Sequence, residues 1–259
     1  MWYQFFLENI HFAINLVAAL MFFAVSWLYL DAWFSRKKIK EVPRWLGFLL
    51  IAISFVFSAI RIESSILSSP ILDQSLSLLL LETSRILGYV LLIVSLIIEP
   101  LQPKPNYKKK KESNILIPLA FMPAVYSVQF LFPILAVLVG FLYLRRATVG
   151  LEDHIKHVAY VFFILAISEI LGSLSLFQTT NNVTLFNIVS SFGPIWILQH
   201  IILLISILVL SKWAFGYLLK RFQSQMFIVF SFSILVIFLL TTVSFTALLV
   251  RQLEANTLN

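Results

Sequence analysis

The chain has no cysteine and little glycine, and each scarcity excludes a class of chemistry. Without cysteine there is no disulfide, no thiolate metal site and no cysteine nucleophile. Glycine occurs only 7 times in 259 residues, and no glycine-rich nucleotide-binding loop is present. The sequence also has no plausible Ser/His/Asp arrangement and no zinc protease motif, so we expect neither an enzyme nor a bound cofactor.

Charged residues are scarce as well. They make up 12% of the chain, whereas hydrophobic residues make up 60%, and the mean hydropathy is +0.96. A soluble domain is about 45–50% apolar and about 25% charged. The apolar residues form long continuous runs, which favours helices over the short alternating strands of a barrel. The composition therefore predicts an all-α polytopic membrane protein whose main partner is the lipid bilayer.

The net charge of +7 does not indicate nucleic-acid binding, because the basic residues lie beside the apolar runs. This is typical of the cytoplasmic loops of membrane proteins. The first apolar run is long, and its positive cluster follows it, so no cleavable signal is evident. We expect a multi-pass protein of the cell inner (plasma) membrane that binds no nucleic acid.

Six apolar runs are each long enough to cross a bilayer. They cover residues 10–34, 45–62, 76–98, 158–177, 191–215 and 226–250. The stretch 115–144 is ambiguous, because it contains Pro118, Pro123 and Pro133, and proline breaks or kinks a helix interior. It could cross once, cross twice as about 115–129 and 131–146, or re-enter from the cytoplasmic side.

The positive-inside rule favours two crossings in this stretch. With the N-terminus outside, all of the 19 basic residues except Arg61, Arg85 and Arg251 then fall in cytoplasmic loops. A single crossing would divide them 11 to 8. The sequence therefore predicts a bundle of about eight transmembrane helices, or seven if 115–144 is one span, with both termini extracytoplasmic.

The two halves of the chain resemble each other. "IKEVPRWLGFLLIAIS" (39–54) is similar to "IKHVAYVFFILAIS" (155–168), and "LLIVSLII" (91–98) is similar to "LLISILVL" (203–210). We therefore expect a duplicated three-helix unit. The predicted organisation is a first membrane unit over 1–100, a cytoplasmic basic linker over 101–114, a short helical hairpin with the second unit over 115–225, and an exit segment over 226–259.

Several ionisable residues lie inside the apolar runs. Charges within a bilayer are costly, so they usually face the interior of a bundle and find partners there. Glu82, Arg85 and Tyr89 share one helix face, since residues three and four apart are neighbours. Glu169 and His200 lie in two other runs, and the eight-crossing arrangement places all five in the outer half of the membrane. These residues are our candidates for an outward-facing ligand or proton site.

A structural interpretation of the same residues stays open. Glu82 and Arg85 could neutralise each other, Glu169 could be capped by a neighbouring helix, and Arg85 could extend to the headgroups. His11, Arg61 and Glu63 lie near the interface, where charge costs little. His154 and His157 are expected to be solvated loop residues.

The end of the chain carries a resemblance. In "LLTTVSFTALLVRQLEANTLN" (239–259) an apolar helix continues without glycine or proline into an amphipathic segment. Arg251 at the boundary, followed by Leu253, Glu254 and Leu258, resembles the exit helix of bacterial membrane receptors such as sensor histidine kinases. The preceding helices are similar to the multi-span sensor modules of such receptors. The resemblance implies signal transduction and, by analogy, a homodimer, but it gives no ligand.

Three functions are compatible with the sequence. The first is a membrane sensor or receptor module that responds to a small ligand or to the membrane state. The second is a small-solute or ion transporter, which the internal repeat and the prolines favour. The third is an intramembrane enzyme that uses Glu169 and His200, or a quinone or haem protein in which His11 and His200 form a haem pair.

Overall fold

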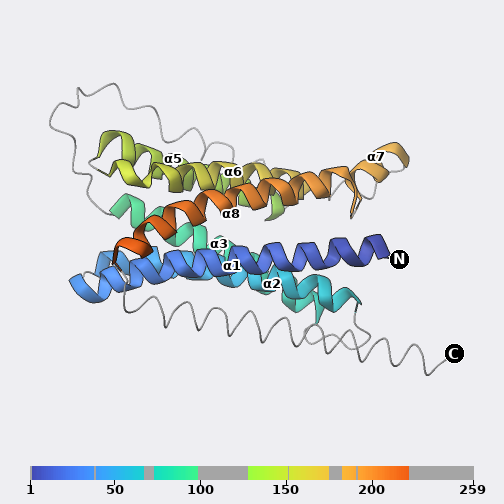
Figure 1. The fold of residues 1–259 in the computed structure, drawn as a ribbon, viewed down its shortest axis with the longest axis horizontal. Helices are drawn as coiled ribbons and strands as arrows, with labels where there is room; N and C mark the ends of the chain where they lie inside the picture. Colours follow the sequence, from blue (N-terminus) through green and yellow to red (C-terminus); the bar gives the residue numbers. More distant parts are fainter. Residues whose placement is uncertain are drawn as a thin grey trace. The chain divides into compact units, whose positions relative to one another are not determined.

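The computed structural model describes residues 2–37, 39–66, 73–98, 128–150, 152–174, 183–190 and 192–221. Nearly all of these residues are helical (Figure 1). In chain order the elements are α1 (Trp2–Arg36), the 3-10 helix η1 (Ile39–Glu41), α2 (Val42–Ile66), α3 (Gln74–Ile98), α5 (Val128–Val149), the 3-10 helix η3 (Asp153–Ile155), α6 (Lys156–Ser173), α7 (Val183–Val189) and α8 (Pro194–Arg221). Residues 1–214 form one compact unit and residues 215–259 a second.

Within the described ranges, six helical segments are long and apolar enough to cross a membrane. They are Leu7–Arg36, Val42–Arg61, Ser75–Ile98, Phe130–Val149, Asp153–Ser173 and Phe186–Tyr217. Five of these segments overlap apolar runs predicted from the sequence, and Phe130–Val149 overlaps the predicted crossing at 131–146. The polytopic all-α class is therefore confirmed. Residues 115–127 of the predicted crossing at 115–129 and the whole crossing at 226–250 lie outside the described residues, and the count of eight stays a prediction.

Pro133 does not interrupt α5, which continues from Val128 to Val149. The proline lies in the second turn of the helix, where its missing N–H removes one hydrogen bond, to the carbonyl of Gln129. Membrane helices tolerate such a loss where neighbouring groups satisfy the carbonyl.

Glycines let neighbouring helices approach closely. A Cβ added at Gly47 of α2 would lie 2.9 Å from the carbonyl oxygen of Gly88 in α3, and the reverse distance is also 2.9 Å. A Cβ at Gly140 of α5 would lie 3.2 Å from the carbonyl oxygen of Ala159 in α6. Association of helices in lipid depends on such packing, because lipid and leucine are equally apolar.

The core of the unit is aromatic and is centred on Phe162 of α6, which is fully buried. Its ring lies 6.3 Å from Phe22 of α1, 6.1 Å from Phe48 of α2, 6.2 Å from Tyr89 of α3 and 5.9 Å from Tyr143 of α5. These separations fall within the range of favourable ring pairs. One side chain therefore packs against four other helices.

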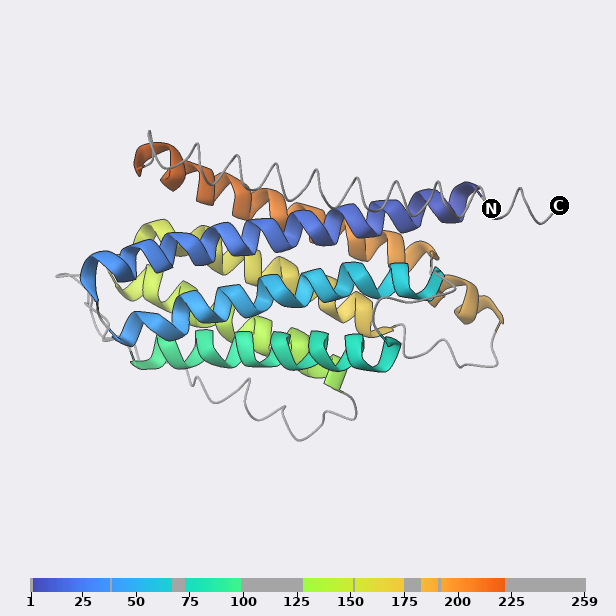
Figure 2. The same cartoon turned by 90° about the horizontal axis from the view of Figure 1, so that it is seen from below.

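The helices alternate in direction. α1, α3, α5 and α8 run one way, and α2 and α6 run the other way (Figures 1 and 2). The ends of α1 and α5 and the beginnings of α2 and α6 consequently lie at one end of the unit. Basic residues gather at this end, as the loop-charge pattern predicted: Arg36, Lys37, Arg44, Arg145, Arg146 and Lys156. Its assignment to the cytoplasm stays a prediction.

Each of the two junctions at this end contains an ion pair. Arg36, the last residue of α1, forms an ion pair with Glu41 in η1 over 3.4 Å. Arg146 near the end of α5 forms an ion pair with Glu152, directly before η3, over 3.7 Å. The two ion pairs do not correspond in the predicted repeat, which aligns Ile39 with Ile155, and the duplicated unit stays a prediction.

Candidate functional site

An ion pair joins α3 to α6 inside the apolar bundle. The Nη1 atom of Arg85 lies 2.8 Å from Oε1 of Glu169, and the two side chains are only 8% and 12% exposed. Removing two charges from water is expensive, and close pairing offsets part of that cost. Charged residues within membrane spans are usually paired in this way and mark functional pathways.

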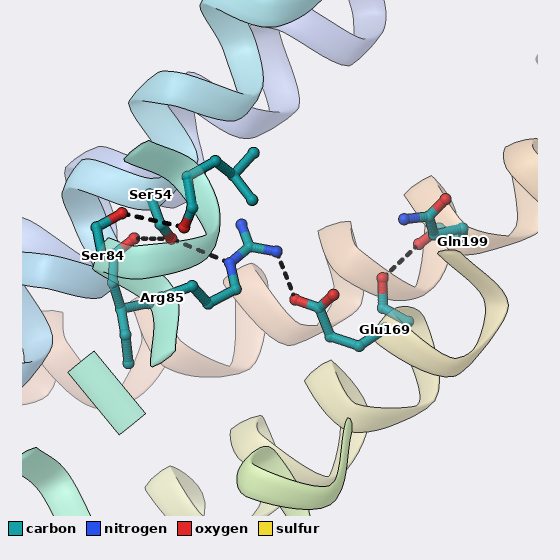
Figure 3. A network of polar contacts seen from close by, with 8 residues as sticks. Ser54, Ser84, Arg85, Glu169 and Gln199 are labelled. Atoms are coloured by element: carbon teal, nitrogen blue, oxygen red, sulfur yellow. Dashed lines mark hydrogen bonds and ion pairs between the residues drawn. The ribbon is translucent and has the colours of Figure 1, made fainter. Parts of the chain in front are cut away.

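Groups from two further helices hold the guanidinium. Its Nε donates a hydrogen bond to Oγ of Ser54 in α2 over 3.1 Å (Figure 3). Ser54 in turn donates to the carbonyl of Ile51 over 2.7 Å. The rings of Phe55 in α2 and Phe132 in α5 lie 4.6 Å and 5.5 Å from the guanidinium carbon, within cation–π range. Four helices therefore meet at Arg85.

Two hydrogen-bond donors at this site have no partner among the residues that the structure describes. Nη2 of Arg85 and Oη of Tyr89 are buried and make no hydrogen bond within the described ranges. Tyr89 follows Arg85 by one helical turn and is fully buried. A buried polar group without a partner costs about 1–3 kcal/mol. Both donors could bind an oxygen atom that accepts hydrogen bonds.

Serine hydroxyls connect α6 to α8 beside the ion pair. Oγ of Ser168, adjacent to Glu169, donates to the carbonyl of Gln199 over 3.1 Å (Figure 3). Ser206 donates to the carbonyl of Val161 over 3.1 Å. The two accepting carbonyls belong to Gln199 in α8 and Val161 in α6, so the serine hydroxyls form hydrogen bonds between these two helices.

A second polar cluster joins α1 to α8. Nδ1 of His11 lies 2.5 Å from Nε2 of His200, and the two residues are 189 positions apart in the sequence. The ring of Trp196 is tilted against that of His200, with centroids 3.9 Å apart, and it stacks on the ring of His11 with centroids 5.8 Å apart. Nε2 of His11 lies 3.1 Å from Nδ2 of Asn15 and 3.3 Å from the carbonyl oxygen of Ser58.

The predicted site residues therefore divide into three groups. Arg85, Glu169 and Tyr89 lie at one site. His200 belongs to the histidine cluster. Glu82 is half-buried and interacts electrostatically with Arg61 of α2, whereas the ion-pair partner of Arg85 is Glu169.

The contact between His11 and His200 was not predicted from the sequence, which placed His11 near the interface. Its signal was weak but present, because Asn15 follows His11 by one turn in an otherwise apolar run, and two polar residues on one helix face indicate a partner helix. Within the described ranges, no group of three histidine, aspartate or glutamate side chains could hold a metal ion.

Comparison with known proteins identifies no relative. No protein-family model, no curated protein and no solved structure matches the chain.

Proposed function

We propose that the chain is a membrane-embedded sensor or receptor module in which a small polar ligand acts on the ion pair between Arg85 and Glu169. The observation that carries the proposal is this buried pair, beside two buried donors that have no partner in the described ranges. Ionisable residues within the membrane are functional candidates by default, because their burial is costly.

The ligand class follows from the unpartnered donors. Nη2 of Arg85 and Oη of Tyr89 both donate, so a carboxylate or another oxygen acceptor suits them. A carboxylate would also compete with Glu169 for the guanidinium. Since the ion pair joins α3 to α6, such competition would loosen the contact between the two helices. A ligand shifts a conformational equilibrium only through such a difference in affinity between two states.

The wider setting belongs to the same proposal. The module would lie in the plasma membrane with the site and both termini toward the outside, and it would signal as a homodimer. The resemblance of residues 239–259 to receptor exit helices supports this setting, although those residues lie outside the described ranges. The charge distribution supports the orientation.

Thermal unfolding of the full chain in lipid nanodiscs tests the proposal. A panel of small mono- and dicarboxylates would be added, and a ligand present at 100 times its Kd should stabilise the protein by about 2.7 kcal/mol. Tyr89→Phe removes only the hydroxyl and should weaken binding. Leu87→Ala on the exposed face of α3 is the matched control. If stabilisation by every carboxylate is the same in wild type and Tyr89→Phe, this site is not the binding site.

Flux separates a sensor from a transporter. A carboxylate that stabilises the protein would be loaded into proteoliposomes and its efflux followed. A sensor binds the solute without transporting it, so efflux should match that from solute-loaded liposomes without protein. Efflux that depends on the protein would assign the chain to the transporters.

A further inference from the structure

We propose that His11 and His200 together form a binding site for a single proton, which links α1 to α2 and α8. The proposal rests on a different observation from the sensor proposal and does not depend on any ligand at Arg85. It starts from hydrogen-bond geometry, which determines where each hydrogen lies.

The position of one hydrogen follows from Trp196. Nδ1 of His200 lies 2.7 Å from the main-chain carbonyl oxygen of Trp196. A carbonyl only accepts, so Nδ1 of His200 carries the hydrogen. In a neutral ring Nε2 is then an acceptor, and the facing atom, Nδ1 of His11, must be the donor.

Asn15 completes the chain of hydrogen bonds. Its Nδ2 donates to the main-chain carbonyl of His11 over 2.8 Å, which determines the orientation of the amide. The second hydrogen of Nδ2 points to Nε2 of His11, 3.1 Å away, and that nitrogen is free to accept. With both rings neutral, every close contact has one donor and one acceptor, except for the contact with Ser58.

An additional proton has one suitable position, Nε2 of His11. The carbonyl oxygen of Ser58 in α2 lies 3.3 Å away and would accept the new hydrogen bond. Asn15 would lose its contact with the ring and keep its bond to the main chain. The imidazolium would also lie beside the face of Trp196, and the negative face of an aromatic ring attracts cations. Proton uptake thus exchanges a bond within α1 for a bond to α2.

The geometry excludes a second proton. It would have to bind Nε2 of His200, which already accepts from Nδ1 of His11 over 2.5 Å. Two N–H groups and two positive charges would then face each other. The pair accepts one proton while α1 and α8 remain packed.

The surrounding charges are of both signs. Glu8 precedes His11 by nearly one turn on α1, and Arg61 of α2 opposes a positive charge on His11. Glu82 of α3 offsets Arg61. Farther along α2, at Ser54, the pair of Arg85 and Glu169 is already neutral overall. Among the described residues, a proton on His11 therefore faces the positive charge of Arg61, which interacts in turn with Glu82.

The test is nitrogen NMR of the full chain in lipid, labelled with ¹⁵N in the histidine rings. The chain has four histidines, and the double variant His154→Gln/His157→Gln removes the two exposed ones. At pH 8 both remaining rings should carry hydrogen on Nδ1, which is the minor tautomer of free histidine. As the pH is lowered from 8 over the range in which the protein stays folded, the pair should take up one proton per chain.

Either of two results would overturn the proposal. One is hydrogen on Nε2 of either ring at pH 8. The other is uptake of zero or two protons per chain over a range in which the protein stays folded. The wild-type signals of His154 and His157 provide an internal reference for solvated rings.

Asn15→Leu gives a second test that leaves both histidines in place. The substitution removes the hydrogen bond that stabilises the neutral form of His11, so proton uptake should move to higher pH, by about half a unit to one unit. Val17→Leu, at an exposed position of the same helix, should leave the midpoint unchanged. A midpoint that is equal in all three proteins contradicts the assignment of Nε2 as the proton acceptor.

Discussion

The guanidinium of Arg85 meets the carboxylate of Glu169 at 2.8 Å, although the two residues are 84 positions apart and belong to different helices. The pair lies among apolar side chains, where either charge alone would be unstable. It connects the group formed by α1, α2 and α3 with α6, and it places a polar site inside the apolar bundle.

Removing one charge of the pair should destabilise the protein more than removing both. Arg85→Leu or Glu169→Leu leaves a buried charge without its partner, which costs about 3–5 kcal/mol. The double variant leaves no unpaired charge and should recover most of that loss. Reversible unfolding of the wild type, both single variants and the double variant in bicelles measures this coupling, with Leu87→Ala as a control at an exposed position. Additive losses would show that the two side chains are not coupled.

Gly88→Val should separate α2 from α3. A Cβ at Gly88 would lie 2.8 Å from Cγ1 of Ile51 and 2.9 Å from the carbonyl oxygen of Gly47. Overpacking of this kind costs about 1–3 kcal/mol. A lower midpoint in the same unfolding assay is expected. Gly216→Val is the control, because a Cβ there has nothing within 4 Å, and equal effects at both glycines would contradict the close approach.

Phe162→Ala should be among the most damaging substitutions in the core. Its ring packs against rings from four other helices, and removal of a buried phenylalanine ring typically costs about 3–5 kcal/mol. Tyr160→Ala removes a ring of similar size from an exposed position two residues earlier on the same helix. The difference between the unfolding free energies of the two variants measures the contribution of the buried ring's packing. A difference below about 1 kcal/mol would contradict the central position of Phe162.

Single cysteines can test the proposed orientation, because the chain has none of its own. Ser75→Cys, near the start of α3, should react with a membrane-impermeant maleimide in intact cells. Ser35→Cys, near the end of α1, should react only after the membrane is opened. Both side chains are exposed in the structure. The reverse pattern would place the basic end outside and contradict the loop-charge argument.

The sequence predicted the helical segments and that charged residues inside the apolar runs would be paired, but it did not predict which residues would pair. Apolar length alone located α1, α2 and α3, since each run is bounded by polar residues. It could not show that Arg85 pairs with Glu169 and not with Glu82, because the partner depends on how the helices rotate and pack. The rotation follows from close approaches such as Gly47 to Gly88, which only the structure shows.

The histidine cluster illustrates the same limit. His11 and His200 lie near opposite ends of the sequence, and neither has a motif around it that would indicate the other. Their contact depends on α8 packing beside α1, which no local pattern encodes. For Pro133 the local sequence was misleading. Proline favours a break or kink in a helix, but α5 continues through Pro133 in the structure.

The most direct test of the sensor proposal is the distance between α3 and α6. Spin labels at Leu79→Cys and Ile170→Cys, both exposed, would be measured by pulsed electron resonance in nanodiscs. Glu169→Gln keeps the size of the side chain and removes its charge. If the ion pair is a switchable contact, Glu169→Gln should shift the distance distribution toward longer values, and Leu87→Ala should not. A single distribution that is identical in all three proteins would mean that the pair is a fixed structural contact and would contradict the proposed sensor.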